Sequence, residues 1–121
     1  MMTVDIYDRV FEFACRVVRL HRVLSRRRGT HMVAANQLLR AGTGVGSNLE
    51  EAKSAQSRRD FIAKARISLK EARESHYWLR IMAKCELVPK RQIEPLLNEA
   101  NEIVAILTAI IIKTTANTAN S

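Results

Sequence analysis

Apolar residues recur every three or four positions along most of the chain, which is the spacing of α-helices that each bury one face. The first such segment predicts a helix from about Val4 to Arg27. Three more segments predict helices that begin near Met32, near Ser57 and near Arg91. The expected core face of the first helix is Ile6, Val10, Phe13, Val17, Leu20 and Leu24.

Capping residues mark the expected ends of these helices. Gly29 is placed to cap the carboxyl end of the first helix, and Ser57 to cap the amino end of the third. The third helix is expected to end near Glu86, just before Pro89, and the fourth to continue to about Thr115.

The length of 121 residues suits one domain with one core. Four long helices with short connections predict an all-α fold, an antiparallel up-and-down four-helix bundle over residues 1–116. Residues 117–121 are expected to form a frayed tail.

Three glycines at alternate positions, Gly42, Gly44 and Gly46, interrupt the pattern of the second helix. A dinucleotide loop would need G-x-G-x-x-G after a strand, and a Walker loop would end in Gly-Lys-Ser/Thr; neither is present. Each glycine costs up to about 1 kcal/mol relative to alanine inside a helix, so close packing must compensate. We therefore expect a continuous or gently kinked helix rather than a loop that would make five helices.

The fourth helix contains an uncharged run, Ile103 to Ile112. About ten residues fall short of the roughly twenty that cross a bilayer, so the run predicts a buried helix and no membrane contact. A helix that is apolar on every side needs neighbours on every side, which favours self-association.

Cysteine use and the amino terminus both favour a cytoplasmic protein. Cys15 and Cys85 lie in apolar helical patterns outside any CxxC or Cys/His cluster, which predicts buried free thiols in a reducing compartment. The acidic, charged amino terminus does not fit a signal peptide.

The formal net charge is +8, from 20 Lys and Arg against 12 Asp and Glu. All of the excess lies before residue 86, and five arginines of the first predicted helix fall within about a third of its circumference. Arginine pairs bidentately with phosphate, so these positions are candidates for nucleic-acid binding; the alternative is a solvated face that only keeps the protein soluble. The candidates are Arg9, Arg16, Arg19, Arg26, Arg27, Arg28, Arg58 and Arg59.

Catalysis and metal binding find little support. Di-iron bundles use Glu-x-x-His motifs, but none of His21, His31 and His76 has Glu three residues before it. Neither cysteine has a local partner for nucleophilic catalysis. We expect no enzyme activity, no metal and no cofactor.

One stretch resembles a known family. "QLLRAGTGVGSNLEEA" followed by "SRRDFIAKARISLKEARESHYWL" is similar to the bacterial four-helix-bundle proteins first noticed in intervening sequences of 23S ribosomal RNA genes. The match is specific over residues 36–80. The matching residues are Gln37, Arg40, Ala41, Ser47, Asn48, Glu51, Arg58, Phe61, Ser68, Leu69 and Glu71.

The resemblance implies a homopentamer of bundles arranged as a barrel. It also extends to an accessory protein of diversity-generating retroelements, which binds nucleic acid through a basic surface and partners a reverse transcriptase. Two departures are Leu49 to Ala52, where members usually have Ile-Ala-Glu-Gly, and Val45-Gly46, where they have isoleucine-proline.

Asn48 and Glu51 lie three residues apart in the second helix, and Ser68 and Glu71 lie three residues apart in the third. Each pair therefore shares a helix face. They form either an exposed, solvated face or a structural polar cluster in which Arg40 or Arg66 neutralises a carboxylate. The resemblance favours the cluster. Its members are Arg40, Asn48, Glu51, Ser68 and Glu71.

These observations together predict a non-enzymatic homo-oligomer, a pentamer by resemblance, that binds RNA or DNA without sequence preference. Few aromatics are available for base stacking; Tyr77 and Trp78 are the obvious pair, with Trp78 expected in the core or an interface. Binding should therefore depend on the phosphate backbone and on salt. The alternative is a structural or protein-binding scaffold whose positive surface docks an acidic partner.

Overall fold

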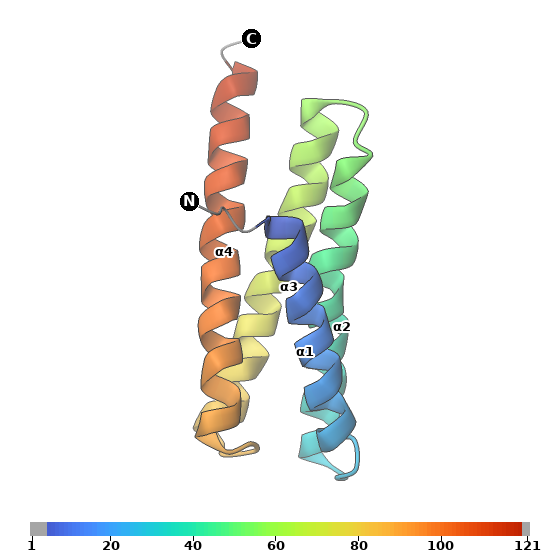
Figure 1. Ribbon diagram of the computed structural model, residues 1–121, viewed down its shortest axis with the longest axis vertical. Helices are drawn as coiled ribbons and strands as arrows, with labels where there is room; N and C mark the ends of the chain where they lie inside the picture. The colour runs from blue at the N-terminus through green and yellow to red at the C-terminus, as the bar shows by residue number, and fades with distance from the viewer. Residues whose placement is uncertain (1–4, 120–121) are drawn as a thin grey trace.

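Four helices run up and down beside one another, each antiparallel to the next (Figure 1). The computed structural model describes residues 5–119. The most extensive contacts are between helices that follow one another in the chain, and α1 makes a smaller contact with α4. The predicted antiparallel four-helix bundle is confirmed. The helices are α1 (Ile6–Leu24), α2 (Thr30–Lys53), α3 (Arg58–Lys84) and α4 (Lys90–Ala119).

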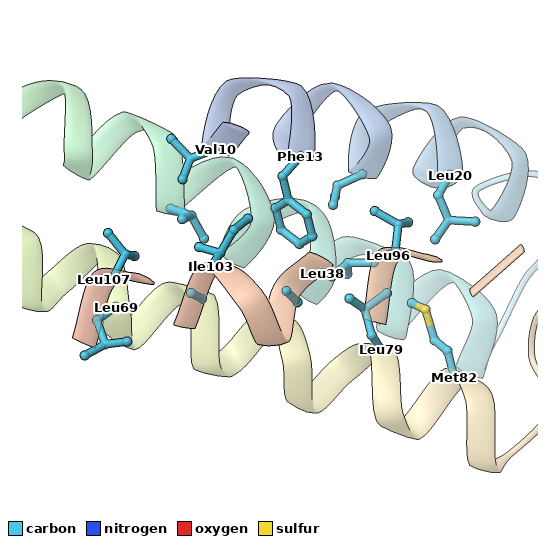
Figure 2. Packing of buried hydrophobic residues seen from close by; sticks show 14 of the residues in the cluster. Val10, Phe13, Leu20, Leu38, Leu69, Leu79, Met82, Leu96, Ile103 and Leu107 are labelled. Atoms are coloured by element: carbon cyan, nitrogen blue, oxygen red, sulfur yellow. The ribbon is translucent and has the colours of Figure 1, made fainter. Parts of the chain in front are cut away.

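The core lies between all four helices and contains mostly aliphatic side chains (Figure 2). Phe13 of α1, Leu38 of α2, Leu79 of α3 and Ile103 of α4 are all essentially buried. The predicted core face of α1 is confirmed, since five of its six residues are buried and Ile6 packs at the core's edge. Burial of a Leu, Ile or Phe side chain contributes about 1.5–3 kcal/mol, so this core is the main source of stability.

Helix α2 is unbroken through its three glycines. Gly42 and Gly46 are buried against α1, and Gly44 faces the Glu71 side chain of α3. The missing side chains let neighbouring helices come close, which offsets the low helix propensity of glycine. The continuous helix expected from the sequence is therefore correct.

The connection between α1 and α2 differs from the expectation. Helix α1 ends at Leu24, three residues before Arg27, and the Ser25 N–H donates to the carbonyl of His21 at 2.8 Å. Gly29 has a φ of 71° and stands directly before α2, so it is not the carboxyl cap of α1. Glycine is suited to this reversal because other residues rarely adopt positive φ.

The other boundaries lie close to the expected ones. Ser57 caps α3 as predicted, because its hydroxyl accepts from the Asp60 N–H at 3.1 Å. Helix α3 ends at Lys84 rather than near Glu86. Helix α4 continues past Thr115 to Ala119, three residues into the segment 117–121 expected to fray, since no Gly or Pro stops it there. Residues 120–121 lie outside the described part of the chain.

Candidate nucleic-acid interface

The outer face of α3 carries a straight row of positive charge that we call the α3 stripe. At 100° per residue its members fall within about a quarter of the helix circumference. All of them are exposed. The α3 stripe consists of Arg59, Arg66, Lys70, Arg73, Arg80 and Lys84.

The acidic residues of α3 do not neutralise this stripe, because each is paired with another cation. Lys64 binds Asp60 at 2.9 Å, and this hydrogen bond, together with one from the Gln56 N–H, lowers the pKa of the Asp60 carboxyl. Glu71 and Glu74 both accept from Arg40 of α2. Within residues 5–119, no cation of the α3 stripe makes an ion pair.

A shallow groove between α3 and α4 lies beside the α3 stripe. It has two hollows, of about 520 and 640 Å³, and Tyr77 lines both of them. Apolar side chains contribute to each: Leu69 and Ile111 to the first, Ile81 and Leu97 to the second. The first hollow is also lined by Glu74, whose carboxylate pairs with Arg40. The groove therefore combines a mainly cationic rim with apolar walls.

Tyr77 is the exposed aromatic side chain of this groove. Its side chain is 56% exposed, and it lies one turn after Arg73 and nearly one turn before Arg80. The ring of Trp78 meets the Tyr77 ring edge-on, with centroids 5.9 Å apart, and Trp78 itself packs against the core. Trp78 is thus part of the fold, whereas Tyr77 is open to a ligand.

The arginines expected on the first helix do not form one surface with the α3 stripe. Arg9 binds Glu99 and Glu102 of α4, with a 3.0 Å hydrogen bond from Nε to Glu99, and these contacts raise its pKa. Arg16 is half-buried, and Arg19 pairs with Glu12 at 3.4 Å. Arg9 thus ties α1 to α4 and contributes little free charge.

The arginines of the two turns lie at opposite ends of the bundle (Figure 1). Residues 26–28 are exposed between α1 and α2, where Arg27 borders a hollow with Val88 and Pro89. Arg58, at the start of α3, donates to the carbonyl of Asn117 at 3.3 Å. Of the candidates named from the sequence, only Arg59 lies on the α3 stripe.

The expected polar cluster is formed in part. Arg40 of α2 reaches Glu71 at 3.4 Å and Glu74 at 2.7 Å on α3, and these carboxylates raise the pKa of its guanidinium. The Ser68 hydroxyl is buried and donates to the carbonyl of Val45 at 2.6 Å. These bonds fasten α3 to the glycine-rich part of α2.

Two other members of the expected cluster lie apart from Arg40. Asn48 donates to the carbonyl of Gly44 at 2.8 Å, within its own helix. Glu51 is exposed and makes no ion pair to any residue that the structure describes. Glu74 belongs to the cluster but was not expected there; its position three residues after Glu71 was the available signal.

Exposed apolar side chains occur on all four helices, with Met32 and Val33 on α2 and Ile67 on α3 among them. On α1, Phe11 is 67% exposed and Val18 is 39% exposed, one above the other at a spacing of seven. On α4, Ile112 is 64% exposed, while Ile106 and Ile110 are half-buried. Helix α4 extends beyond the start of α1, which leaves its last turns less covered (Figure 1).

Helix α4 is also long and apolar enough, by length and composition alone, to cross a membrane over Lys90–Asn117. The segment Lys90–Asn117 is longer than the uncharged run from Ile103 to Ile112. Core helices of soluble proteins meet the same criterion, and Ile103 and Leu107 are fully buried in this bundle. The absence of membrane contact stays a prediction.

Over residues 5–119, the His, Cys, Asp and Glu side chains do not gather into a metal site. In the part of the chain that is described, no three His, Cys, Asp or Glu side chains come together as a possible metal site. Both cysteines are free; Cys15 is half-buried, but Cys85 is exposed at the end of α3, so the expectation of two buried thiols is wrong for Cys85.

Comparison with known proteins agrees with the sequence and the fold. The model of the family described as "23S rRNA-intervening sequence protein" matches residues 2–109. The chain belongs to this family. The crystal structure of a protein with unknown function from the S23 ribosomal protein family of Bacteroides thetaiotaomicron is 39% identical to it, with a TM-score of 0.82. The match covers 88% of this chain and 98% of that one. No curated protein matches the chain.

Proposed function

We propose that this member of the 23S rRNA-intervening sequence family is a non-enzymatic, cytoplasmic homo-oligomer that holds the phosphate backbone of RNA or DNA. The α3 stripe is the observation that carries the proposal. Six exposed cations in one row, none of them in an ion pair to another described residue, match a repeating polyanion. Because phosphates are the same in every sequence, binding is expected to show little sequence preference.

Self-association is the second part of the proposal. The apolar strip of α1 with Phe11 and Val18 differs from that of α4 with Ile112, so one copy's α1 would pack against the next copy's α4. Head-to-tail contacts form a ring when the rotation between copies closes, and the pentamer that the family resemblance implies is such a ring. A ring multiplies the charge of +8 by the number of copies, which strengthens its attraction for nucleic acid.

The experiment that tests the binding is a salt titration. Fluorescence anisotropy of labelled 20-nucleotide single strands and 20-base-pair duplexes of mixed sequence is followed between 50 and 200 mM salt. With four to six phosphates engaged per subunit, the plot of log affinity against log salt should have a slope of about −3 to −5. Absence of binding to both probes at 50 mM salt would remove the nucleic-acid role. The remaining candidate would then be a scaffold that docks an acidic protein.

A further inference from the structure

The groove beside the α3 stripe suggests which form of nucleic acid the protein takes, an inference that rests on the proposed function. We propose that the ligand is single-stranded, with its phosphates on the α3 stripe and one base stacked on Tyr77 in the α3–α4 groove. The inference depends on the position of Tyr77 and on the apolar walls of the groove.

Tyr77 lies within the row of cations. It falls inside the arc that the α3 stripe covers and is 56% exposed. Single-strand binding surfaces combine a positive track for the backbone with an aromatic ring on which a base stacks. Such a ring has no use for a duplex, whose base faces are already stacked on one another.

The groove is apolar on either side of Tyr77. Leu69 and Ile111 on one side, and Ile81 and Leu97 on the other, offer apolar contacts next to the cations. The outer surface of a duplex is phosphate and sugar, and it would leave these contacts unused. An unstacked base is flat and apolar on its faces and could enter hollows of about 520 and 640 Å³.

The α3 stripe also has a length and shape that suit an extended strand. From Arg66 to Lys84 the α3 stripe is straight and about 27 Å long at 1.5 Å per residue. From Arg66 onward its members are three, four or seven residues apart, so a cation recurs about every 5 to 10 Å along the helix axis. Tyr77 lies in the seven-residue gap between Arg73 and Arg80. A straight row of this kind suits a short extended strand of several nucleotides, which can adapt its backbone to the protein.

The Trp78 ring restrains Tyr77 as a platform for base stacking, and it also supplies a fluorescence signal for binding. Its edge-on contact, at 5.9 Å between centroids, limits how far the Tyr77 ring can move. Trp78 is also the single tryptophan of the chain. A base that stacks on Tyr77 would come close enough to alter the fluorescence of Trp78.

The test compares Tyr77→Ala with Tyr77→Phe in the full-length protein, using labelled dT20 and a 20-base-pair duplex. For Tyr77→Ala, the affinity for dT20 should fall about 5- to 140-fold, the range found when a stacking aromatic is removed. The salt slope should not change, because no charge is lost. Tyr77→Phe keeps the ring and should bind dT20 like the unmodified protein.

A second measurement does not depend on any variant. An oligonucleotide that contains 5-iodouracil is irradiated in complex with the unmodified protein, and the cross-linked peptide should contain Tyr77. Binding to duplex and dT20 with no loss in Tyr77→Ala, or cross-links only elsewhere, would overturn this inference and leave the proposed function intact. Displacement of dT20 by polyglutamate of equal charge at equal concentration would also overturn it. Failure of both probes to bind would instead reject the proposed function.

Discussion

Gly42 of α2 lies directly against Val17 of α1, so closely that a Cβ atom at position 42 would be 2.9 Å from both methyl carbons of Val17. Val17 is fully buried and β-branched, and it has little freedom to move away. The contact explains why a residue of low helix propensity stands in the middle of a long helix. It also distinguishes Gly42 from Gly46, where a Cβ would meet the Val10 carbonyl oxygen at an ordinary 3.5 Å.

Gly42→Ala should therefore destabilise the protein and Gly46→Ala should not. Overpacking costs about 1–3 kcal/mol and the helix propensity of alanine returns up to about 1 kcal/mol, so Gly42→Ala should lose about 1–2 kcal/mol of unfolding free energy. Gly46→Ala should be neutral or gain up to about 1 kcal/mol. Urea unfolding at one protein concentration measures both. Equal effects of the two substitutions would show that the contact with Val17 is not what excludes alanine.

The end of α3 offers a stabilising substitution. The Leu87 N–H donates to the carbonyl of Met82 at 3.0 Å and the Glu86 N–H to that of Ala83 at 3.3 Å, which is a Schellman motif with Glu86 at a φ of 56°. Glycine adopts this conformation without the penalty that a Cβ brings. Glu86→Gly should raise the unfolding free energy by about 0.5–1 kcal/mol.

Glu86→Ala is the matched control, because it removes the carboxylate but keeps the Cβ. It should gain nothing in thermal or urea unfolding. A gain as large as that of Glu86→Gly would attribute the effect to the lost charge rather than to the backbone.

His76 gives the fold a pH dependence. Partial burial lowers the pKa of its imidazole below 6.5, and the charge of Arg80 lowers it further. The unfolded chain therefore binds a proton at His76 more readily than the folded one, so this contribution is complete above about pH 6.5 and is lost as the pH falls through the folded pKa. The urea midpoint should drop between pH 7.5 and pH 5, and less in His76→Gln. The same drop in both proteins would assign the effect to other groups.

The two apolar strips predict how copies associate. Phe11→Lys places a charge in the apolar strip of α1, and Ile112→Lys places one in the apolar strip of α4. Each variant alone should therefore sediment as a monomer near 13.7 kDa rather than as the ring. If α1 of one copy packs on α4 of the next, a mixture of the two variants keeps one intact contact and should form a heterodimer. A mixture that stays monomeric would contradict a head-to-tail contact between these strips.

The sequence was sufficient for features that depend on local periodicity and capping. The spacing of Val10, Phe13 and Val17 identifies the core face of α1, and Ser57 with Asp60 identifies the start of α3. Both signals operate within one or two turns of helix. The fold class followed from them.

Contacts between distant residues explain what was missed. The charge of Arg9 looked free because its partner Glu99 lies 90 residues away and cannot be inferred from local spacing. The repeat of arginine every seven residues from Arg59 to Arg80 is present in the sequence but was not recognised as a candidate surface. The structure shows that Glu71 and Glu74, which lie among these arginines, pair instead with Arg40 of α2.

The central claim is that nucleic acid binds along the α3 stripe. It is tested most directly by two variants that each remove three positive charges, one from the α3 stripe and one from another surface. The triple variant Arg66→Gln, Arg73→Gln, Arg80→Gln removes three exposed charges of the stripe. The control Arg26→Gln, Arg27→Gln, Arg28→Gln removes the same charge from the turn before α2. Both keep the length and polarity of the side chains, and both should unfold like the parent protein.

The measurement is the salt dependence of binding to the same labelled oligonucleotide for the parent and the two triple variants. Each phosphate contact contributes about 0.7–0.9 to the slope, so the stripe variant should have a slope shallower by about 2–3 and should bind more weakly at every salt concentration. The control should change the slope by less than about 1. A stripe variant that matches the parent, or a control that loses more than the stripe variant, would contradict the account.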